Sequence, residues 1–436
     1  MCKIKYPLLA GLTTMALLLQ PVAGADWQEE VETLTSQVLP QAIANRHWFH
    51  ARPELGNREF ETARKIIDEL NRLGFDEIEQ GVAHTGVVAV LKGGLSGPTV
   101  ALRADMDGLP VTEKTGLAFA SKVTTLWQGV ETGVMHACGH DAHMAILLGV
   151  AEVLSQMREG IPGNVKFIFQ PAEEGPPVGE EGGAQLMIKQ GVLGGRYAPG
   201  AIFGLHVFPG RTGSIMYKAD GFMAAADSLE IEIVGKQAHG SMPWGGVDPI
   251  TAAAQVINAL QTVVSRQLDI SQAPAVVTIG SIHGGNRGNI IPESVKLTGT
   301  IRTLDPGMRE QVQSLIKQTA QQAAMSMGAK ALVSIDLGYP VTFNDAKLTK
   351  AMRPVLERTA LGGLATEVKP YMGAEDFSFY ANEIPGLFFA LGVAHDDPTV
   401  EIATNHSPYF YVNDKALPVG IKALSQLALE WLYSNR

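Results

Sequence analysis

Four short apolar runs, almost free of polar residues, limit the folds open to this chain. They occupy residues 86–91, 99–103, 165–170 and 201–206, and helical patterns such as residues 144–157 lie between them. A strand reads as continuously apolar when both of its faces are covered, as in a parallel sheet flanked by helices. The order of these segments therefore predicts an α/β fold with a central, mostly parallel sheet that helices cover on both faces.

A different pattern interrupts this order between residues 222 and 338. Leu229, Ile231 and Ile233 alternate with polar residues, as in a strand with one exposed face. The segment then reads as helix, strand, strand, helix and strand, at residues 249–267, 276–282, 295–303, 306–327 and 331–335. This β-α-β-β-α-β order is that of a ferredoxin-like unit. We therefore expect a small inserted domain at 222–338, which divides a larger domain into residues 26–221 and 339–436.

Residues 1–25 have the pattern of a signal peptide. Two lysines precede a short apolar stretch at residues 7–19, and an Ala-Gly-Ala cleavage site ends at Ala25. The apolar stretch is too short for an ordinary membrane helix, so an uncleaved anchor is the less favoured alternative. No later apolar run is long enough to cross a bilayer. The sequence predicts an exported protein, periplasmic or secreted, without a membrane span after cleavage.

The net charge and the cysteine content exclude some classes of function. The formal net charge is −10 and no basic run occurs, whereas nucleic-acid binding needs clustered Lys and Arg. Of the two cysteines, Cys2 leaves with the signal segment, so Cys138 has no partner for an internal disulfide. A nucleic-acid partner is thus excluded, and the single remaining thiol needs another explanation.

The residues around Cys138 supply that explanation. Residues 135–143 read Met-His-Ala-Cys-Gly-His-Asp-Ala-His, which places one thiol, three imidazoles and one carboxylate within nine positions. Thiolate and imidazole are ligands typical of Zn, and imidazole with carboxylate also accepts Mn, Co or Ni. The alternative is a His-rich surface loop without metal. We interpret the cluster as part of a metal site.

Further polar residues end the apolar runs. Asp105 and Asp107 follow the run at 99–103, and Glu173 and Glu174 follow the run at 165–170. Ligands gather at the carboxyl ends of strands in α/β sheets. Adjacent carboxylates take different roles when one binds a metal and the other holds a water as general base.

Two isolated histidines complete this set. His206 ends the run at 201–206, and His406 lies near the end of the chain. A lone histidine is more often structural than a ligand. Together with the Cys-His cluster and the acidic pair, however, these two are what a two-metal hydrolase requires.

The motifs in combination resemble those of the N-acyl-amino-acid amidohydrolases, which include the hippurate hydrolases and the indoleacetyl-amino-acid hydrolases. This family belongs to the wider aminoacylase and carboxypeptidase metallopeptidase superfamily. The resemblance rests on residues 103–110, 135–143, 170–175 and 235–249, and it extends over nearly all of the chain from residue 50 to His406. It implies hydrolysis of the amide bond of an N-acyl amino acid or a dipeptide.

The resemblance also implies roles for individual residues. Two divalent metal ions per subunit, Mn, Zn, Co or Ni, would be held by Cys138, His140, Glu174, His206 and His406. Glu173 would be the general base. Asp107 would hold a ligating imidazole in place rather than bind metal. Asp141 is expected to support the ligands in the same way, although the resemblance does not say which ligand it contacts.

The inserted domain carries the remaining implied residues. His239, in the motif at 235–240, would stabilise the oxyanion, in the partner subunit of a homodimer or in its own. Asn289 and Arg302 would grip the substrate carboxylate. The inserted domain would then act both as a lid and as the dimer contact.

Other functions remain open at this point. A metallo-exopeptidase (a carboxypeptidase or dipeptidase) or a deacetylase on the same scaffold fits the same ligand set. A cysteine hydrolase that uses Cys138 with a neighbouring histidine would leave Glu173 and Glu174 without a function. A non-catalytic binding protein for peptides or metal would not need Glu173. The acyl group, the amino acid and the metal are not specified by the sequence.

Overall fold

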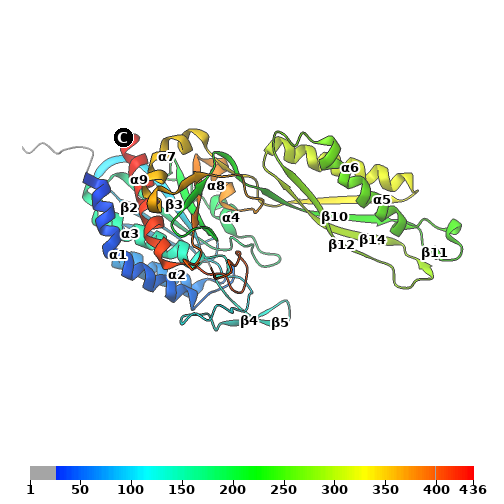
Figure 1. The fold of residues 1–436 in the computed structure, drawn as a ribbon, viewed down its shortest axis with the longest axis horizontal. Coiled ribbons are helices and arrows are strands. Elements are labelled where there is room, and N and C mark those ends of the chain that lie inside the picture. The colour runs from blue at the N-terminus through cyan, green and yellow to red at the C-terminus, as the bar shows by residue number, and fades with distance from the viewer. Residues whose placement is uncertain (1–25, 398) are drawn as a thin grey trace, which may run out of the picture.

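The computed structural model describes residues 26–397 and 399–436 of the chain. The predicted signal segment, residues 1–25, lies outside the described residues. The chain forms a large α/β body and an elongated small domain that extends away from it (Figure 1). The two parts are joined by the segments on either side of residues 225–337.

An eight-stranded sheet forms the centre of the large body. Its strand order is β1-β2-β6-β3-β7-β18-β8-β17. The strands are β1 (Glu77–Val82), β2 (Gly86–Lys92), β3 (Leu95–Asp105), β6 (Pro162–Gln170), β7 (Ile202–Phe208), β8 (Ile215–Tyr217), β17 (Ala365–Glu367) and β18 (Gly386–Gly392). The pairs β3–β6, β3–β7, β7–β18 and β8–β17 are parallel, and β1–β2, β2–β6 and β8–β18 are antiparallel. The predicted α/β class with a mostly parallel sheet is confirmed.

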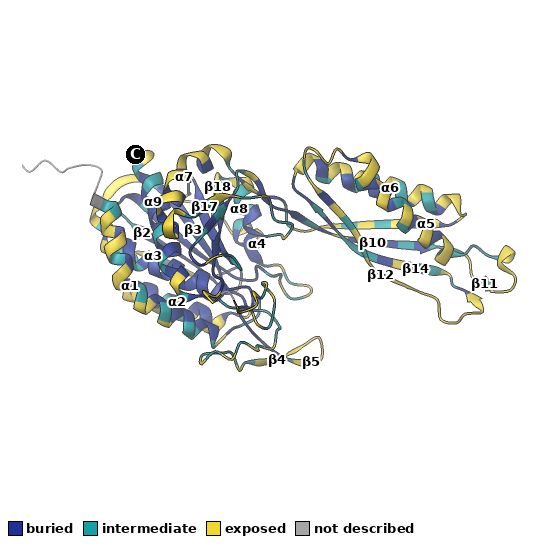
Figure 2. Cartoon of the chain, in the orientation of Figure 1, coloured by how far each residue is buried: buried dark blue, intermediate teal, exposed yellow. Residues whose placement is uncertain are grey.

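Helices cover both faces of this sheet. One face carries α2 (Phe60–Arg72), α3 (His140–Gln156) and α9 (Leu417–Ser434), with α1 (Asp26–His50) and α7 (Ala346–Thr359) packed against them. The shorter helices α4 (Gly183–Lys189) and α8 (Phe377–Glu383) share a separate apolar cluster with the other face. Nearly every residue of α3 is buried, because this helix lies between the sheet and α1 (Figure 2).

The small domain has the order of elements that the sequence predicts. It comprises β10 (Ala225–Val234), α5 (Pro249–Thr262), β12 (Ala275–Gly284), β14 (Ser294–Thr303), α6 (Pro306–Ser326) and β15 (Lys330–Leu337). Its sheet has the order β12-β14-β10-β15, and every pairing is antiparallel. Alternate side chains of the strands form a core with α5 and α6. The helix expected to reach residue 267 ends as α-helix at Thr262 and continues as a π-helical turn, Val263–Gln267.

Short strand pairs lie at the borders of both parts. β9 (Asp220–Met223) pairs with β16 (Thr342–Asn344) where the chain passes between the parts. β11 (Ala238–His239) pairs with β13 (Ile290–Ile291) at the far end of the small domain (Figure 1). β4 (Thr124–Trp127) and β5 (Val130–Gly133) form a hairpin on the large body. None of the helices in the described ranges has the length and apolar character needed to cross a membrane.

Candidate metal centre

The candidate metal centre lies at the carboxyl edge of the large sheet. β3 ends at Asp105 and β6 at Gln170, while His206 lies two residues before the end of β7. The helix α3 begins at His140, so its first turn faces the same edge. Parallel strands bring their carboxyl ends together, which explains why residues far apart in the sequence meet here.

The backbone before α3 is shaped by a glycine. Gly139 has a φ of +93°, a region that L side chains rarely adopt. A Cβ at this position would come within 2.3 Å of Cγ2 of Val207. Cys138 and His140 therefore sit on either side of a tight turn that only glycine permits without a shift of its surroundings.

Cys138 meets two of the predicted histidines. Its Sγ lies 3.3 Å from Nε2 of His206 and 3.3 Å from Nε2 of His406. Ligand bonds of roughly 2.0–2.3 Å place donors on one ion at about this separation. The donor atoms of Cys138, His140 and His206 all lie within 4.8 Å of one another. Those of Cys138, Glu174 and His406 form a second such group. Cys138 thus belongs to two adjoining donor sets, as a dinuclear site requires.

The hydrogen bonds of the histidines leave their inner nitrogens free for a metal. Nδ1 of His140 lies 3.2 Å from Oδ1 of Asp107, and its buried Nε2 has no hydrogen-bond partner. Nδ1 of His206 donates to the carbonyl of Val207 at 2.8 Å. Because each Nδ1 carries the proton, each Nε2 presents a lone pair to the donor set. The residues present fit a pair of divalent ions.

Asp107 supports two of the predicted ligands at once. While Oδ1 faces His140, Oδ2 accepts a hydrogen bond of 2.9 Å from the backbone N–H of Glu174. The side chain is almost completely buried. This geometry agrees with the expected supporting role, in which the carboxylate fixes the ring and the loop that carries the next ligand.

The environment of the thiol favours a metal ligand over a nucleophile. Burial raises the pKa of Cys138, and the charges of Glu174 and Glu173 raise it further. A nucleophilic cysteine needs the opposite, a pKa lowered by a neighbouring positive group. Divalent cations reverse the local effect and deprotonate a coordinating thiol.

Glu173 lies beside the donor sets in a group of buried carboxylates. Its Oε2 is 3.8 Å from Nε2 of His140. On its other side, donor oxygens of Glu173, Glu375 and Asp376 lie within 4.8 Å of one another. Burial raises the pKa of Glu173 well above its usual value, and the charge of Glu375 adds to this. A raised pKa makes a carboxylate a stronger proton acceptor. The hydroxyl of Tyr339 donates to the backbone carbonyl of Glu173 at 2.6 Å.

Arg103 neutralises the buried carboxylates behind the site. Its guanidinium contacts Asp105 at 2.7 Å, Asp376 at 2.8 Å and Glu375 at 3.0 Å. Asp105 in turn accepts a hydrogen bond of 2.5 Å from Nδ1 of His143. Arg103 is not among the predicted site residues, although a charged residue within an apolar run signals a buried ion pair.

His143 lies near the centre, but its two hydrogen bonds leave neither ring nitrogen free to bind a metal. Nδ1 donates to Asp105, and Nε2 accepts from the backbone N–H of Val207 at 2.8 Å. No lone pair remains for an ion. His143 therefore orients Asp105 and the strand that carries His206.

The expectation that Asp141 supports a metal ligand is wrong. Its Oδ2 accepts from Nε of Arg46 at 3.1 Å and lies 2.9 Å from Nδ1 of His50. Both partners come from α1, a helix without a counterpart among the predicted elements. Consecutive residues of a helix point about 100° apart, so Asp141 faces α1 when His140 faces the metal donors.

His239 and Asn289 lie together but away from the metal donors of their own chain. Backbone pairing of β11 with β13 places His239 opposite Ile290, and the N–H of Gly240 donates to the carbonyl of Asn289 at 2.8 Å. This strand pair stands at the end of the small domain opposite to the large body (Figure 1). His239 is exposed there.

Arg302 lies at the other end of the same domain. It is the last residue but one of β14, a ten-residue strand that spans roughly 30 Å. Asn289 precedes the opposite end of that strand. The length of β14 therefore separates Arg302 and Asn289 within one chain. That the two grip one substrate carboxylate stays a prediction, which would require residues from two chains.

Comparison with known proteins places the chain among metal-dependent hydrolases. The sequence profile of peptidase family M20/M25/M40 matches residues 101–430. Thermostable carboxypeptidase 2 of Saccharolobus solfataricus is 36% identical over 414 residues, which are 94% of this chain and 100% of that protein. N-acetyl-L-cysteine deacetylase of Bacillus subtilis is 37% identical over 91% of this chain and 89% of its own length. IAA-amino acid hydrolase ILR1-like 2 of Arabidopsis thaliana is 37% identical over 91% and 86%.

A solved structure supports the same relationship. The YXEP protein of Bacillus subtilis, described as a dinuclear metal binding peptidase, superposes with a TM-score of 0.77 and 35% sequence identity. The alignment covers 91% of this chain and 99% of that one. The similarity thus includes both the large body and the small domain.

Proposed function

The chain belongs to peptidase family M20/M25/M40, and from that premise we propose that it hydrolyses the amide bond of N-acyl amino acids. As a member of this family it is a metal-dependent hydrolase of amide bonds with a dinuclear centre. The observation that carries the proposal is the meeting of Cys138 with His206 and His406, with Glu173 beside them. Relatives named as a deacetylase and as an IAA-amino acid hydrolase support an acyl amino acid as substrate.

Five residues are proposed as ligands of the two ions. They are Cys138, His140, Glu174, His206 and His406, and the two donor sets that share Cys138 support this assignment. Two divalent ions bound there would polarise the substrate carbonyl and lower the pKa of a water molecule. The identity of the ions, Mn, Zn, Co or Ni, belongs to the proposal.

Glu173 is proposed as the general base. A carboxylate oxygen of Glu173 takes a proton from the attacking water and later passes it to the leaving amine. Burial, together with the charge of Glu375, keeps the pKa of Glu173 high, and the hydroxyl of Tyr339 holds its backbone. Asp107 holds the ring of His140 and the loop of Glu174 in position.

Metal content separates the two neighbouring glutamates. We expect Glu173→Ala to retain both ions while turnover falls by about 10²–10⁴, and Glu174→Ala to lose metal. The measurement is metal per chain by inductively coupled plasma mass spectrometry, alongside hydrolysis by apo protein reloaded with Mn, Zn, Co or Ni. Equal metal content in the two variants would refute this division of roles.

We further propose that His239 acts in the partner subunit of a homodimer. Its place at the end of the small domain, away from its own large body, supports action in trans (Figure 1). Exposed Met242 and Trp244 beside it, 50% and 80% accessible, supply apolar contact area. Asn289 would enter with His239, whereas Arg302 would serve the site of its own chain.

Mixing two inactive variants tests this arrangement. Glu173→Ala and His239→Ala each inactivate the homodimer. After exchange of subunits, random pairing restores roughly a quarter of wild-type turnover if His239 acts in trans, because one site of each hybrid is then intact. No recovery despite hybrid formation, verified by native mass spectrometry, would place His239 in the site of its own chain, and an active His239→Ala homodimer would show that the residue has no role.

A carboxypeptidase or dipeptidase is the second candidate, favoured by the relative named as a carboxypeptidase. The two functions differ in the group on the acyl side of the scissile bond. A panel of hippurate, N-acetyl and indoleacetyl amino acids, compared with dipeptides that carry a free amino group, separates them. Faster hydrolysis of the free dipeptides would favour the second candidate.

Export through a cleaved signal peptide is proposed from the sequence pattern of residues 1–25. N-terminal sequencing of the protein recovered from the periplasm or the medium should begin at Asp26. Recovery of the full-length chain from the cytosol alone would contradict export.

A further inference from the structure

The two neighbouring glutamates of the metal centre lie on a four-residue turn, residues 172–175, here called the glutamate turn. The N–H of Gly175 donates to the carbonyl of Ala172 at 3.3 Å, so Glu173 and Glu174 occupy the two middle positions. Ala172 has a φ of +50°, in the left-handed region that L side chains rarely adopt. The direction in which both carboxylates leave the chain therefore depends on a backbone conformation that alanine does not prefer.

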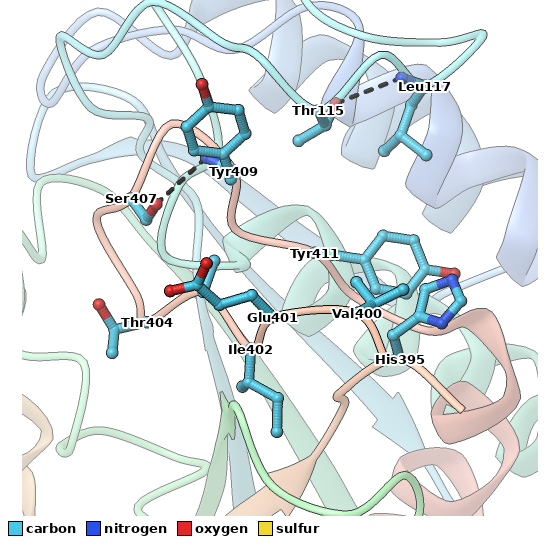
Figure 3. A pocket seen from close by; sticks show the side chains of 11 residues that line it. Thr115, Leu117, His395, Val400, Glu401, Ile402, Thr404, Ser407, Tyr409 and Tyr411 are labelled. Carbon is cyan, nitrogen blue, oxygen red and sulfur yellow. Dashed lines mark hydrogen bonds between the residues drawn. The ribbon is translucent and has the colours of Figure 1, made fainter. Parts of the chain in front are cut away.

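His406 is a second residue of the centre with an unfavourable backbone, at a φ of +68°. It lies in the turn between Thr404 and Ser407, which line a cavity of about 790 Å³ (Figure 3). A neighbouring side chain holds that turn in place, because Asn405 donates to the carbonyl of Cys138 at 3.1 Å. Unfavourable backbone persists only where its surroundings determine it, and it gathers at functional sites. The first residue of the glutamate turn requires a comparable restraint.

The buried carboxylate of Glu59 supplies this restraint. Its Oε1 accepts a hydrogen bond of 2.9 Å from the N–H of Ala172, and its Oε2 accepts one of 2.6 Å from the hydroxyl of Thr85. All three residues are buried. Glu59 stands directly before α2 and Thr85 directly before β2, so the carboxylate joins three separate segments. A carboxylate is costly to bury unless its oxygens accept hydrogen bonds, and here both oxygens do.

The other residues of the glutamate turn have restraints of their own. The hydroxyl of Tyr339 donates to the carbonyl of Glu173 at 2.6 Å, and the N–H of Glu174 donates to Asp107 at 2.9 Å. These two bonds hold the middle of the turn but do not act on the residue where it begins. The contact with Glu59 is the one that fixes the N–H of the first residue, and with it the side of the backbone from which the turn starts.

We propose that Glu59 is a positioning residue, which holds Ala172 in its left-handed conformation and thereby directs the carboxylate of Glu173 towards the attacking water. The proposal rests on the proposed function of Glu173 as general base. Without the acceptor, alanine adopts the negative φ that it prefers, and the turn rotates. A displacement of about 1 Å at a reacting group can lower the rate by about 10²-fold.

Glu59→Met tests the proposal, because it keeps most of the side-chain volume and removes both acceptor oxygens. With an N-acyl amino acid that the metal-loaded wild-type protein hydrolyses, we expect kcat to fall by about 10–100-fold and KM to stay nearly unchanged. Metal per chain should keep its wild-type value, because Asp107 still holds the N–H of Glu174. Glu59→Gln retains an acceptor for Ala172 and should keep kcat within about threefold of the wild type.

Adding Ala172→Gly separates a positioning role from a general loss of stability. Glycine adopts positive φ about as readily as negative φ, so it needs no restraint to form the turn. In the double variant with Glu59→Met, we expect kcat to recover by about fivefold or more relative to Glu59→Met alone. A substitution that acted only by weakening the fold would not be corrected by a second loss of side-chain contacts.

Glu54→Met is the matched control. Glu54 precedes Glu59 in the same loop, and its carboxylate accepts from the N–H groups of Glu61 and Thr62 at the start of α2. The same replacement there should weaken the helix and leave kcat unchanged. If Glu59→Met fails to fold, Thr85→Val is measured in the same way. It removes only the hydroxyl that fixes Oε2 of Glu59 and should lower kcat several-fold.

A crystal structure of Glu59→Met gives a readout that does not depend on turnover. We expect a negative φ at Ala172 and a displaced carboxylate of Glu173, and a retained positive φ overturns the proposal. An unchanged kcat or a loss of metal in Glu59→Met, or no recovery in the double variant, overturns it as well. If the wild-type protein hydrolyses no N-acyl amino acid under any of the four metals, the proposed function is overturned instead. The φ of Ala172 in Glu59→Met then decides the positioning role by itself.

Discussion

The positive charge of Arg103 neutralises a group of buried carboxylates, and we expect both the stability of the large body and the order of the metal centre to depend on it. Its guanidinium is fully buried and contacts the carboxylates of Asp105, Asp376 and Glu375 within 3.0 Å. Arg103→Met keeps most of the side-chain volume and removes the charge. Removal of one partner from a buried ion pair leaves an uncompensated charge and costs about 3–5 kcal/mol. We expect a loss of that size in the free energy of unfolding at pH 7.

The loss should depend on pH in a defined direction. Burial raises the pKa of Glu375 to about 8 and that of Asp376 to about 6, although Arg103 opposes both shifts. An acid whose folded pKa lies above its unfolded value destabilises the folded state increasingly as pH rises from the unfolded pKa to the folded pKa. Arg103 offsets this effect only where the acids are ionised in the folded state, which occurs as pH rises through about 6 for Asp376 and about 8 for Glu375. The deficit of Arg103→Met should therefore be largest above pH 8 and shrink towards pH 5.

Urea unfolding of the metal-free protein, followed by circular dichroism, measures this deficit across the pH range. The control is Arg58→Met, which breaks an exposed pair with Glu180 and should change stability little at any pH. Because Asp105 also holds His143, metal affinity should fall in Arg103→Met and stay unchanged in the control. If Arg103→Met matches the wild type in stability at pH 8, the carboxylates do not depend on the guanidinium and the reasoning is refuted.

Three further perturbations follow from single contacts. Burial lowers the pKa of His50, but the charge and the hydrogen bond of Asp141 outweigh this effect and raise the pKa to about 9. A histidine with a raised folded pKa stabilises the folded state fully below its unfolded pKa, and this stabilisation is lost as pH rises to the folded pKa. His50 should therefore make wild-type stability fall by about 3 kcal/mol from pH 6.5 to pH 9. Urea titrations should show a fall that is smaller by about 3 kcal/mol in His50→Gln, and an identical slope in that variant would contradict the assignment. Tyr339→Phe removes the hydrogen bond to the Glu173 carbonyl and should lower kcat several-fold, by up to about tenfold, with metal content unchanged; an unchanged kcat would show that this bond does not position the base. Gly139→Ala places a Cβ in a left-handed turn and against Val207, so titration calorimetry should show weaker metal binding. Metal binding with wild-type affinity would show that the turn tolerates a side chain.

The large sheet was predictable because its strands carry a local signal. The apolar runs mark β2, β3, β6 and β7 within a few residues, since a strand covered on both faces can contain little polar surface. β7 nevertheless continues beyond His206 to Phe208, because a strand can carry a functional side chain before it ends.

α1 escaped prediction because polar side chains interrupt the face that it buries. Its buried apolar residues, such as Val38 and Phe49, share that face with the buried polar residues Asn45, Arg46 and His50. Tertiary packing against α3, rather than a strong amphipathic pattern, keeps it helical.

The residues proposed to carry out the chemistry were easier to predict from the sequence than the residues that hold them in place. Cys138, His206 and Glu173 stand in motifs whose composition is unusual, so they could be selected from the sequence. The partners that fix them, such as Arg103 and Tyr339, come from distant segments without a motif of their own. Asp141 was misplaced for the converse reason: it stands within a motif, but the turn of α3 directs it to Arg46.

The central claim is that Cys138 lies between two divalent ions held by residues from four separate segments. Crystals of metal-loaded protein, with anomalous differences collected above and below the absorption edge of the loaded metal, test it directly. We expect two anomalous peaks per chain, with Sγ of Cys138 between them and Nε2 of His206 and of His406 among their ligands. A single peak, or two peaks that lie away from the sulfur of Cys138, would contradict the account.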